Sequence, residues 1–242
     1  MDACAYSYSE LAKMIDHSLL HPALTDREII DGCRLAKKYN VASVCVKPSG
    51  IEIATKILKG SDVAVGTVVG FPHGSSLTDV KRYETELACK LGAREIDMVI
   101  NIGKALSRDW NYVQNEIQII TDTAHRFKAI VKVIIETDYI TDDRFKRKLC
   151  RICNEVNADF VKTSTGFGFI KGSDGKYFYK GATEEDVNLM RKTCRSEVLI
   201  KAAGGIRDLN TLIKMRQLGV SRVGATATAQ ILDEYIAKFG CK

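Results

Sequence analysis

Val198-Leu199-Ile200-Lys201-Ala202-Ala203-Gly204-Gly205 is a short apolar run that contains a lysine and ends in two glycines. The same arrangement occurs at Ala158-Asp159-Phe160-Val161-Lys162-Thr163-Ser164, which Gly166 soon follows. Short apolar runs of this kind predict strands buried on both faces, as in a parallel sheet flanked by helices. Each run is therefore expected to bury a lysine, which is costly unless the ammonium group finds a partner or loses its proton.

The rest of the chain also alternates between short apolar runs and amphipathic segments. The apolar runs predict eight strands, at residues 13–18, 42–46, 63–69, 95–100, 130–135, 159–162, 199–202 and 222–225. The segments between them predict helices, among them 26–39, 77–91, 112–127, 142–155, 183–193 and 209–218. This pattern in 242 residues predicts an α/β fold, a (β/α)8 TIM barrel, as a single domain over residues 1–242. A doubly wound open sheet is the alternative, but no G-x-G-x-x-G motif follows an early strand.

The composition narrows the class of protein. With 45% hydrophobic and 27% charged residues, the chain is typical of a soluble globular protein. It has no apolar run of membrane-spanning length, and its first residues lack the basic and apolar regions of a secretory signal, so we expect a cytoplasmic protein without a membrane partner. The net charge of +6 is dispersed and forms no basic stripe with interleaved aromatic residues, so no nucleic-acid partner is expected.

Eight cysteines and four histidines could indicate disulfides or a metal site. Reduced thiols packed as small apolar groups are expected instead, because the chain is neither short nor secreted in type. Cys150 and Cys153 have the spacing of one zinc-ligand pair, but the histidines do not supply a second pair. The sequence therefore predicts no metal and no cofactor.

In a barrel of this type, the active site lies where the strands end, so ionisable residues near those ends should converge. The amine of Lys162 or Lys201 is a nucleophile only when neutral, and both burial and a second ammonium group nearby lower its pKa. Asp97, within Glu95-Ile96-Asp97-Met98-Val99-Ile100, is expected to pair with one lysine and keep it charged. This combination suits Schiff-base catalysis. A buried Lys–Asp pair that merely fills the barrel is the alternative, but a second buried cation would then cost stability without structural return.

Glycine-rich loops follow the last two predicted strands, at Ala203-Gly204-Gly205-Ile206-Arg207 and Val223-Gly224-Ala225-Thr226. In barrels these two loops commonly bind a phosphate through backbone N–H groups, and Arg207 and Thr226 would add a cation and a hydroxyl donor. Asp16, near the end of the first strand, is expected to contact a substrate hydroxyl or a water. The complete set of candidate substrate-binding residues is Asp16, Cys45, Gly166, Gly204, Gly205, Arg207, Gly224 and Thr226.

On these residues the chain closely resembles the deoxyribose-phosphate aldolases, which are class I aldolases with a barrel fold. The resemblance runs from near residue 11 to near residue 230. Its matching stretches are Ile15-Asp16-His17-Ser18-Leu19-Leu20, Ser43-Val44-Cys45-Val46, Gly70-Phe71-Pro72-His73-Gly74, residues 95–101, Lys132-Val133-Ile134-Ile135-Glu136-Thr137, residues 160–168 and residues 201–207.

The resemblance implies reversible cleavage of 2-deoxy-D-ribose 5-phosphate to acetaldehyde and D-glyceraldehyde 3-phosphate, in deoxyribonucleotide catabolism. Lys162 matches the Schiff-base lysine of the family. Lys201 matches the second lysine, which perturbs the first and helps to relay protons, and Asp97 matches the carboxylate that works with it. A sugar phosphate is then the substrate, and a homodimer is expected because such barrels often associate through their helices.

The chain departs from the family pattern in the loop after the sixth strand. Phe167 stands where some members have a phosphate-binding lysine, and residues 169–180 read as an insertion on the phosphate side of the mouth. Lys171, within this insertion, is a candidate replacement for the missing lysine.

Two other functions stay open on the sequence alone. One is a transaldolase-like Schiff-base enzyme that acts on a longer sugar phosphate. The other is a catalytically idle barrel that only binds sugar phosphates, and such a protein would form no imine.

Overall fold

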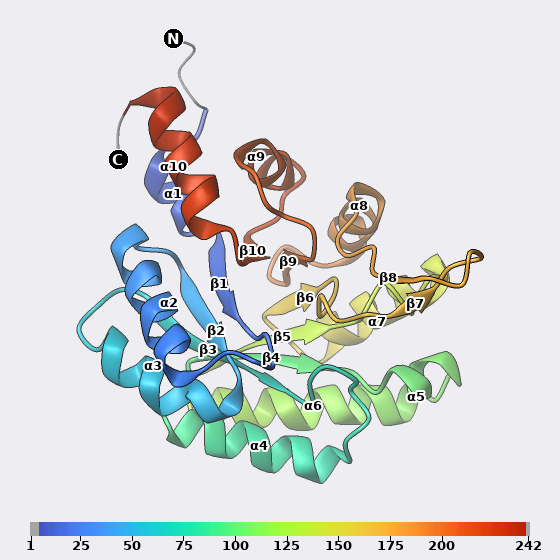
Figure 1. Cartoon of the computed structure of the whole chain (residues 1–242). Coiled ribbons are helices and arrows are strands. Elements are labelled where there is room, and N and C mark those ends of the chain that lie inside the picture. The colour runs from blue at the N-terminus through green and yellow to red at the C-terminus, as the bar shows by residue number, and fades with distance from the viewer. Residues whose placement is uncertain (1–4, 241–242) are drawn as a thin grey trace.

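The computed structural model describes residues 5–240. Its centre is a closed barrel of eight parallel strands surrounded by helices (Figure 1), which confirms the predicted (β/α)8 fold. The strands are β1 (Ile15–Leu19), β2 (Ser43–Val46), β3 (Ala64–Val69), β4 (Glu95–Val99), β5 (Ile130–Ile134), β6 (Phe160–Lys162), β9 (Leu199–Ala203) and β10 (Arg222–Ala225). In space they follow the order β1-β10-β9-β6-β5-β4-β3-β2. The first four residues, which contribute to the targeting expectation, lie outside the described residues.

Helices cover the outside of the barrel. They are α1 (Tyr8–Ala12), α2 (Asp26–Tyr39), α3 (Ile51–Leu58), α4 (Thr78–Lys90), α5 (Ile102–Leu106), α6 (Trp110–Arg126), α7 (Asp143–Glu155), α8 (Glu184–Thr193), α9 (Leu209–Gln217) and α10 (Thr228–Phe239). A hairpin of β7 (Ile170–Lys171) and β8 (Tyr177–Phe178) projects between β6 and α8 (Figure 1). Within residues 5–240, no helix is both long and apolar enough to cross a membrane.

Local sequence signals explain why these elements begin and end where they do. Thr25 and Glu28 form a reciprocal capping box at the start of α2, and Asn40 ends that helix in the left-handed conformation. The Thr183 side chain accepts a hydrogen bond from Asp186 N at the start of α8, the cap that the sequence predicts. The expected strands and helices match the observed ones to within two residues at each end.

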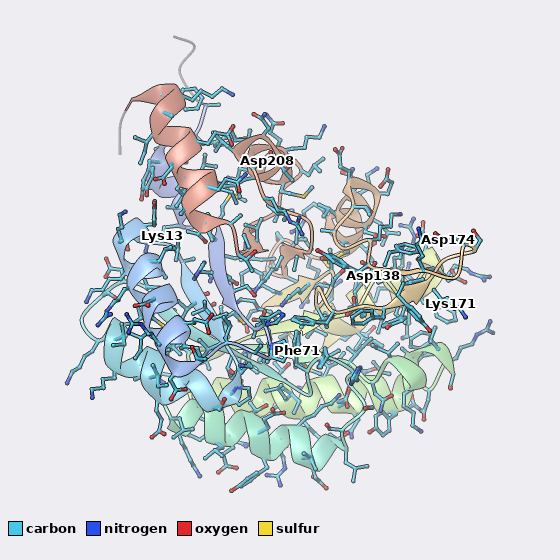
Figure 2. All side chains as sticks on the ribbon, in the orientation of Figure 1. Lys13, Phe71, Asp138, Lys171, Asp174 and Asp208 are labelled. Atoms are coloured by element: carbon cyan, nitrogen blue, oxygen red, sulfur yellow. The ribbon has the colours of Figure 1, made fainter. Side chains whose placement is uncertain are left out.

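The first strand begins two residues later than expected, and this moves Asp16. Lys13 ends α1, where its backbone N–H donates to Ser9 O. Its Nζ atom donates to Asn40 Oδ1 at 2.9 Å and to Val41 O at 3.1 Å (Figure 2). Asp16 is therefore the second residue of β1, inside the barrel rather than at the rim.

Side chains alternate along the strands, so the barrel has two different buried regions. Outward-facing residues such as Ile96 and Val131 join the large apolar core between the sheet and the helices. Inward-facing residues of the same strands, such as Asp97 and Lys132, are charged. The apolar core holds the barrel together, while the barrel interior is left for polar chemistry.

A buried ion pair fastens the helical shell to the barrel. Lys81 on α4 is fully buried, and its Nζ atom donates to Glu116 Oε1 on α6 at 2.7 Å. The same Nζ donates to Gly74 O at 2.7 Å and to Val99 O at 2.8 Å, and Glu116 Oε2 accepts from Asn101 N at 2.8 Å. These contacts join two helices, the loop after β3 and the end of β4.

Replacing Lys81 by Ala should lower the free energy of unfolding by about 3–5 kcal/mol, because Glu116 would be left buried without its partner. Urea unfolding measures the loss. Lys90→Ala is the matched control, since Lys90 on the same helix pairs with Glu86 at 2.6 Å in an exposed position and should matter little. Equal losses in the two variants would contradict this role for Lys81.

Candidate active site

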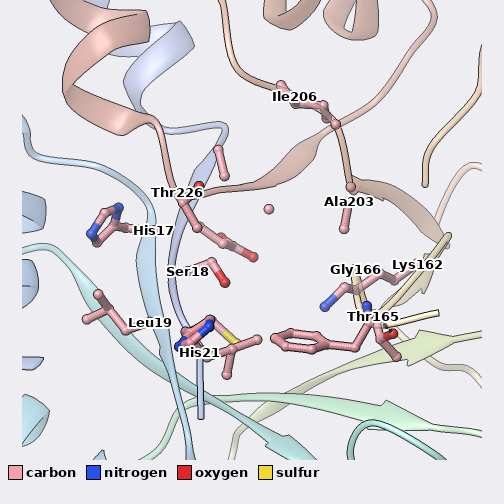
Figure 3. Close-up of a pocket in the computed structure, with 18 of the residues that line it drawn as sticks. His17, Ser18, Leu19, His21, Lys162, Thr165, Gly166, Ala203, Ile206 and Thr226 are labelled. Carbon is pink, nitrogen blue, oxygen red and sulfur yellow. Dashed lines mark hydrogen bonds between the residues drawn. The ribbon is translucent and has the colours of Figure 1, made fainter. Parts of the chain in front are cut away.

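A cavity of about 440 Å³ lies at the end of the barrel where the strands finish. It is bounded by residues that follow β6, β9 and β10, among them Gly166, Ile206 and Thr226 (Figure 3). The predicted site residues in its lining are Asp16, Cys45, Lys162, Gly166, Lys201, Gly204, Gly205, Arg207, Gly224 and Thr226. Asp97 lies directly behind this lining, in contact with both lysines.

The two lysines meet at one carboxylate oxygen. Lys162 and Lys201 are register partners on the neighbouring strands β6 and β9. Lys162 Nζ lies 2.7 Å from Asp97 Oδ2, and Lys201 Nζ lies 2.6 Å from the same oxygen. All three side chains are buried, with relative exposures of 3% or less. Asp97 thus bridges both lysines, whereas the sequence suggested that it serves one.

A further set of charges lies beneath these three residues. Lys132 Nζ lies 3.1 Å from Asp97 Oδ1, 3.0 Å from Asp16 Oδ2 and 2.5 Å from Glu95 Oε2. Arg222 binds both Asp16 and Glu95, the latter at 2.8 Å. Lys201 Nζ also reaches Asp16 Oδ2, at 2.5 Å. Every carboxylate of this interior cluster therefore bridges at least two basic groups.

The interior cluster contains more bases than acids. Its members are the acids Asp16, Glu95 and Asp97 and the bases Lys132, Lys162, Lys201 and Arg222. If all seven were ionised, one positive charge would be uncompensated in a region shielded from water, which is costly. Loss of one proton removes the excess, and Lys162 is the base with the fewest carboxylate partners.

The directions of the pKa shifts also identify Lys162 as the base that loses its proton most easily. Burial lowers the pKa of Lys162, and the Lys201 cation lowers it further against the attraction of Asp97. Burial also acts against the Lys201 ammonium, but Asp16 and Asp97 outweigh it and raise the pKa of Lys201. Burial opposes the charge of Asp97 as well, yet the three neighbouring lysines hold the pKa of Asp97 far below its usual range. The result is one amine ready to be neutral beside one ammonium and one carboxylate.

Asp16 is held by the bases of the interior cluster, and its expected contact with a substrate hydroxyl or a water stays a prediction. Its carboxylate is fully buried and accepts from Ser43 Oγ at 2.8 Å in addition to its contacts with the bases. Nearby polar groups on the rim stay neutral: burial lowers the pKa of His17 to about 4 and raises the pKa of Cys45 to about 11. Cys45 consequently lines the cavity as a small apolar group.

The loop after β6 is fixed by a carboxylate from the preceding strand end. Glu136 Oε2 accepts from Thr165 Oγ1 at 2.5 Å and from Thr165 N at 3.1 Å. Thr165 Oγ1 in turn accepts from Phe167 N at 2.9 Å. Phe167 packs edge-on against Phe71, with 5.4 Å between ring centroids, and forms an apolar wall beside Cys45. Thus Phe167 lines the cavity with an apolar face.

Lys171 does not take the place of the missing lysine. It lies exposed on the projecting hairpin (Figure 2) and is not part of the cavity lining. Tyr179, at the end of the hairpin, does line the cavity. The glycine-rich loop after β9, which carries Arg207, lines it too. The described part of the chain places no group of three or more His, Cys, Asp or Glu side chains to hold a metal ion.

The sequence reasoning missed Glu95, Lys132 and Arg222 as members of the site. Lys132 carries the signal that singled out the other two lysines, because it interrupts the apolar run Ile130-Val131-Lys132-Val133-Ile134. Glu95 and Arg222 each begin a strand. A charged residue is ordinary at that position, and only closure of the barrel brings these two together.

A (β/α)8 barrel with a desolvated lysine beside an ammonium and a carboxylate contains the groups that a Schiff-base enzyme needs. Comparison with known proteins is consistent with this class. The model of the DeoC/LacD family aldolases matches residues 11–230, and the chain belongs to that family. The protein is therefore an aldolase, a carbon–carbon lyase.

Individual relatives agree with the family assignment. The deoxyribose-phosphate aldolase of Rhodopirellula baltica is 44% identical over 97% of this chain and 93% of its own. The solved structure of the aldolase QR15 superposes with a TM-score of 0.86 at 34% identity, covering 95% of this chain and 97% of that one. The deoxyribose phosphate aldolase from Aeropyrum pernix, described as a unique tetrameric structure, has a TM-score of 0.84 at 26% identity and covers 96% and 93% of the two chains.

Lys201→Met should move the reactivity of Lys162 to higher pH. Without the Lys201 cation, Asp97 acts on fewer bases, so the pKa of Lys162 rises. Each unit of that rise lowers the neutral fraction at pH 7 about tenfold. The measurement is the pH profile of borohydride trapping of acetaldehyde on Lys162.

Lys146→Met is the control for this experiment. Lys146 on α7 pairs with Asp186 at 2.5 Å outside the barrel, so its loss should leave the profile in place. A Lys201→Met profile that coincides with the wild-type profile would show that Lys201 does not depress the pKa of Lys162.

Proposed function

We propose that this chain is a class I aldolase that reversibly cleaves 2-deoxy-D-ribose 5-phosphate to acetaldehyde and D-glyceraldehyde 3-phosphate. It would do so as a single cytoplasmic domain over residues 1–242, with Lys162, Lys201 and Asp97 as its catalytic residues. The observation that carries the proposal is the shared contact of Lys162 and Lys201 with Asp97 Oδ2, at 2.7 and 2.6 Å, at the base of the cavity.

The chemistry begins with the neutral amine of Lys162 at the aldehyde carbon C1. The ammonium of Lys201 supplies the proton with which the carbinolamine oxygen leaves as water, and Asp97 stabilises the iminium charge on Lys162 Nζ. Removal of the C3 hydroxyl proton then breaks the C2–C3 bond, and its electron pair moves to the iminium to give an enamine. D-glyceraldehyde 3-phosphate leaves, C2 takes up a proton, and hydrolysis of the imine releases acetaldehyde.

The phosphate would bind at the opposite end of the cavity. Gly204 and Gly205 have φ angles of +94° and +84°, a conformation that favours glycine and exposes backbone N–H groups. A Cβ atom on Gly204 would lie 2.7 Å from Gly181 Cα, so no larger residue fits there. Arg207, Gly224 and Thr226 complete this end of the lining, while Cys45 and Gly166 lie nearer to Lys162.

Borohydride reduction in the presence of acetaldehyde tests this proposal directly. We expect an ethyl adduct on Lys162, located by intact mass and peptide mapping, and none in Lys162→Ala. Lys81 should stay unmodified in the same sample, because it is buried outside the cavity and bonded on all sides.

Product analysis separates the proposal from its rivals. Cleavage of deoxyribose 5-phosphate to acetaldehyde supports it, whereas transfer of a three-carbon unit between longer sugar phosphates would indicate a transaldolase-like enzyme. A folded protein that gives no adduct and no cleavage would be an idle binder of sugar phosphates.

The expected homodimer is also a proposal, with α4 as its contact face. Leu77, directly before this helix, and Val80, Tyr83 and Leu87 along one of its faces are between 43% and 71% exposed. An apolar row of this size on a surface marks an association site, and a second copy of the chain would cover it symmetrically. The tetrameric relative from Aeropyrum pernix shows that barrels of this family can associate.

Sedimentation velocity should show a dimer for the wild-type protein and a monomer for Tyr83→Glu, because a buried, unpaired carboxylate would oppose contact. Tyr177→Glu, at an equally exposed aromatic residue on the hairpin, is the matched control and should leave the dimer intact. A monomeric wild-type protein would contradict the proposal.

A further inference from the structure

The hairpin of residues 169–180 brings a side chain to the phosphate end of the cavity. We propose that Tyr179 is a specificity-determining residue that binds the phosphate group of the substrate together with Arg207. This inference rests on the proposed function, since it assigns a residue to one end of the same site. It also assigns a role in substrate binding to the inserted segment.

The hairpin is a formed element closed by its own turn. Strands β7 and β8 pair through Ile170 with Phe178 and Lys171 with Tyr177. At the turn, Gly172 N donates to Lys176 O at 2.8 Å, and Asp174 Oδ1 accepts from Lys176 N at 3.0 Å. Tyr179 directly follows Phe178, the last residue of this ladder, so the hairpin fixes the position of its backbone.

Both ends of the hairpin are fastened to the loop between β5 and α7. At one end, Phe169 N donates to Tyr139 Oη at 2.9 Å. At the other end, Asp138 Oδ1 accepts from Lys180 N at 2.8 Å and from Gly181 N at 3.1 Å. Figure 2 shows Asp138 at the base of the hairpin and Asp174 farther out along it. The anchor therefore lies immediately next to Tyr179.

A close backbone contact fixes the distance from the hairpin to the phosphate loop. Gly181 and Gly204 approach so closely that a Cβ atom on Gly181 would lie 2.8 Å from Gly204 C. Ala182 N also donates to Gly204 O at 3.3 Å. The base of the hairpin and the glycine-rich loop after β9 are thus held as one unit, with Tyr179 at their junction.

Tyr179 and Arg207 both line the cavity, and they are bonded to each other. Arg207 Nη2 donates to Tyr179 Oη at 3.3 Å, so the phenol acts as acceptor and keeps its own proton for another acceptor. Arg207 is exposed at the rim of the cavity. Among residues 5–240 it has no carboxylate partner in an ion pair, and its side chain bonds to Tyr179. A guanidinium without a carboxylate and a phenol with a free proton, side by side near backbone N–H groups, suit a phosphate dianion.

The other side chains near the insertion place no hydrogen-bond donor in the cavity. Lys171 is absent from the cavity lining, and Tyr177 packs on Phe169, with 6.5 Å between ring centroids, away from it. Phe167 reaches the cavity but has no donor. Of residues 169–180, Tyr179 is thus the one whose polar side chain lines the cavity.

The test is Tyr179→Phe, assayed with 2-deoxy-D-ribose 5-phosphate and with 2-deoxy-D-ribose. Loss of one hydrogen bond to a charged group should raise KM for the phosphorylated substrate about tenfold and leave kcat nearly unchanged. The kcat/KM for the unphosphorylated sugar should not change, so the preference for phosphate should fall by the same factor. Inorganic phosphate, as a competitive inhibitor, should weaken in parallel.

Tyr177→Phe is the matched control, because it removes a phenol from the same hairpin without touching the cavity. It should behave as wild type with both sugars. An unchanged phosphate preference in Tyr179→Phe would overturn the inference, even though Lys162 still formed its adduct. Equal losses with both sugars would overturn it as well, because they would indicate a general disturbance of the mouth. If the wild-type protein cleaved neither sugar and formed no adduct, the proposed function itself would fail.

Discussion

Contact between Asp97 and the lysines is the constraint on which the site depends. Its Oδ2 atom holds Lys162 and Lys201 within 2.7 Å, in a place where water cannot screen either charge. Lys201 has a second carboxylate partner in Asp16, and Lys162 does not. This difference in partners, rather than any difference in burial, decides which amine gives up its proton. The rest of the interior cluster keeps Asp97 ionised and in register.

The fold separates two kinds of interaction that would weaken one another if mixed. Stability comes from the apolar layer between the sheet and the helices, and from buried ion pairs such as Lys81–Glu116. The charged side chains of the interior cluster come from the inward faces of the same strands. Alternation of side chains along a strand allows this separation within three consecutive residues, as Ile96, Asp97 and Met98 illustrate. The loops after β6 and β9 then adapt a fixed chemical centre to a particular substrate.

The barrel and the two buried lysines at its cavity could be predicted because each left a local signal. A lysine inside an apolar run is an anomaly in itself, and strands that follow one another in a barrel become neighbours. Asp97 was found in the same way. Arg222 and Glu95 left no such signal, since their importance depends on closure of the barrel. Tyr179 could not be predicted, because its position depends on anchors at Asp138 and Tyr139, far earlier in the chain.

The crowded interior of the barrel also bears on how this protein could change over time. Buried charge clusters can often be replaced by apolar side chains of similar volume with a gain in stability. By this rule, the ion pairs of Lys132, Glu95 and Arg222 are a weak argument for stability, and their proposed value lies in how they hold Asp97 and Asp16. A laboratory selection that rewarded heat resistance alone would therefore have no reason to keep these charges in the barrel. Replacing them would raise the stability of the enzyme and abolish its activity together.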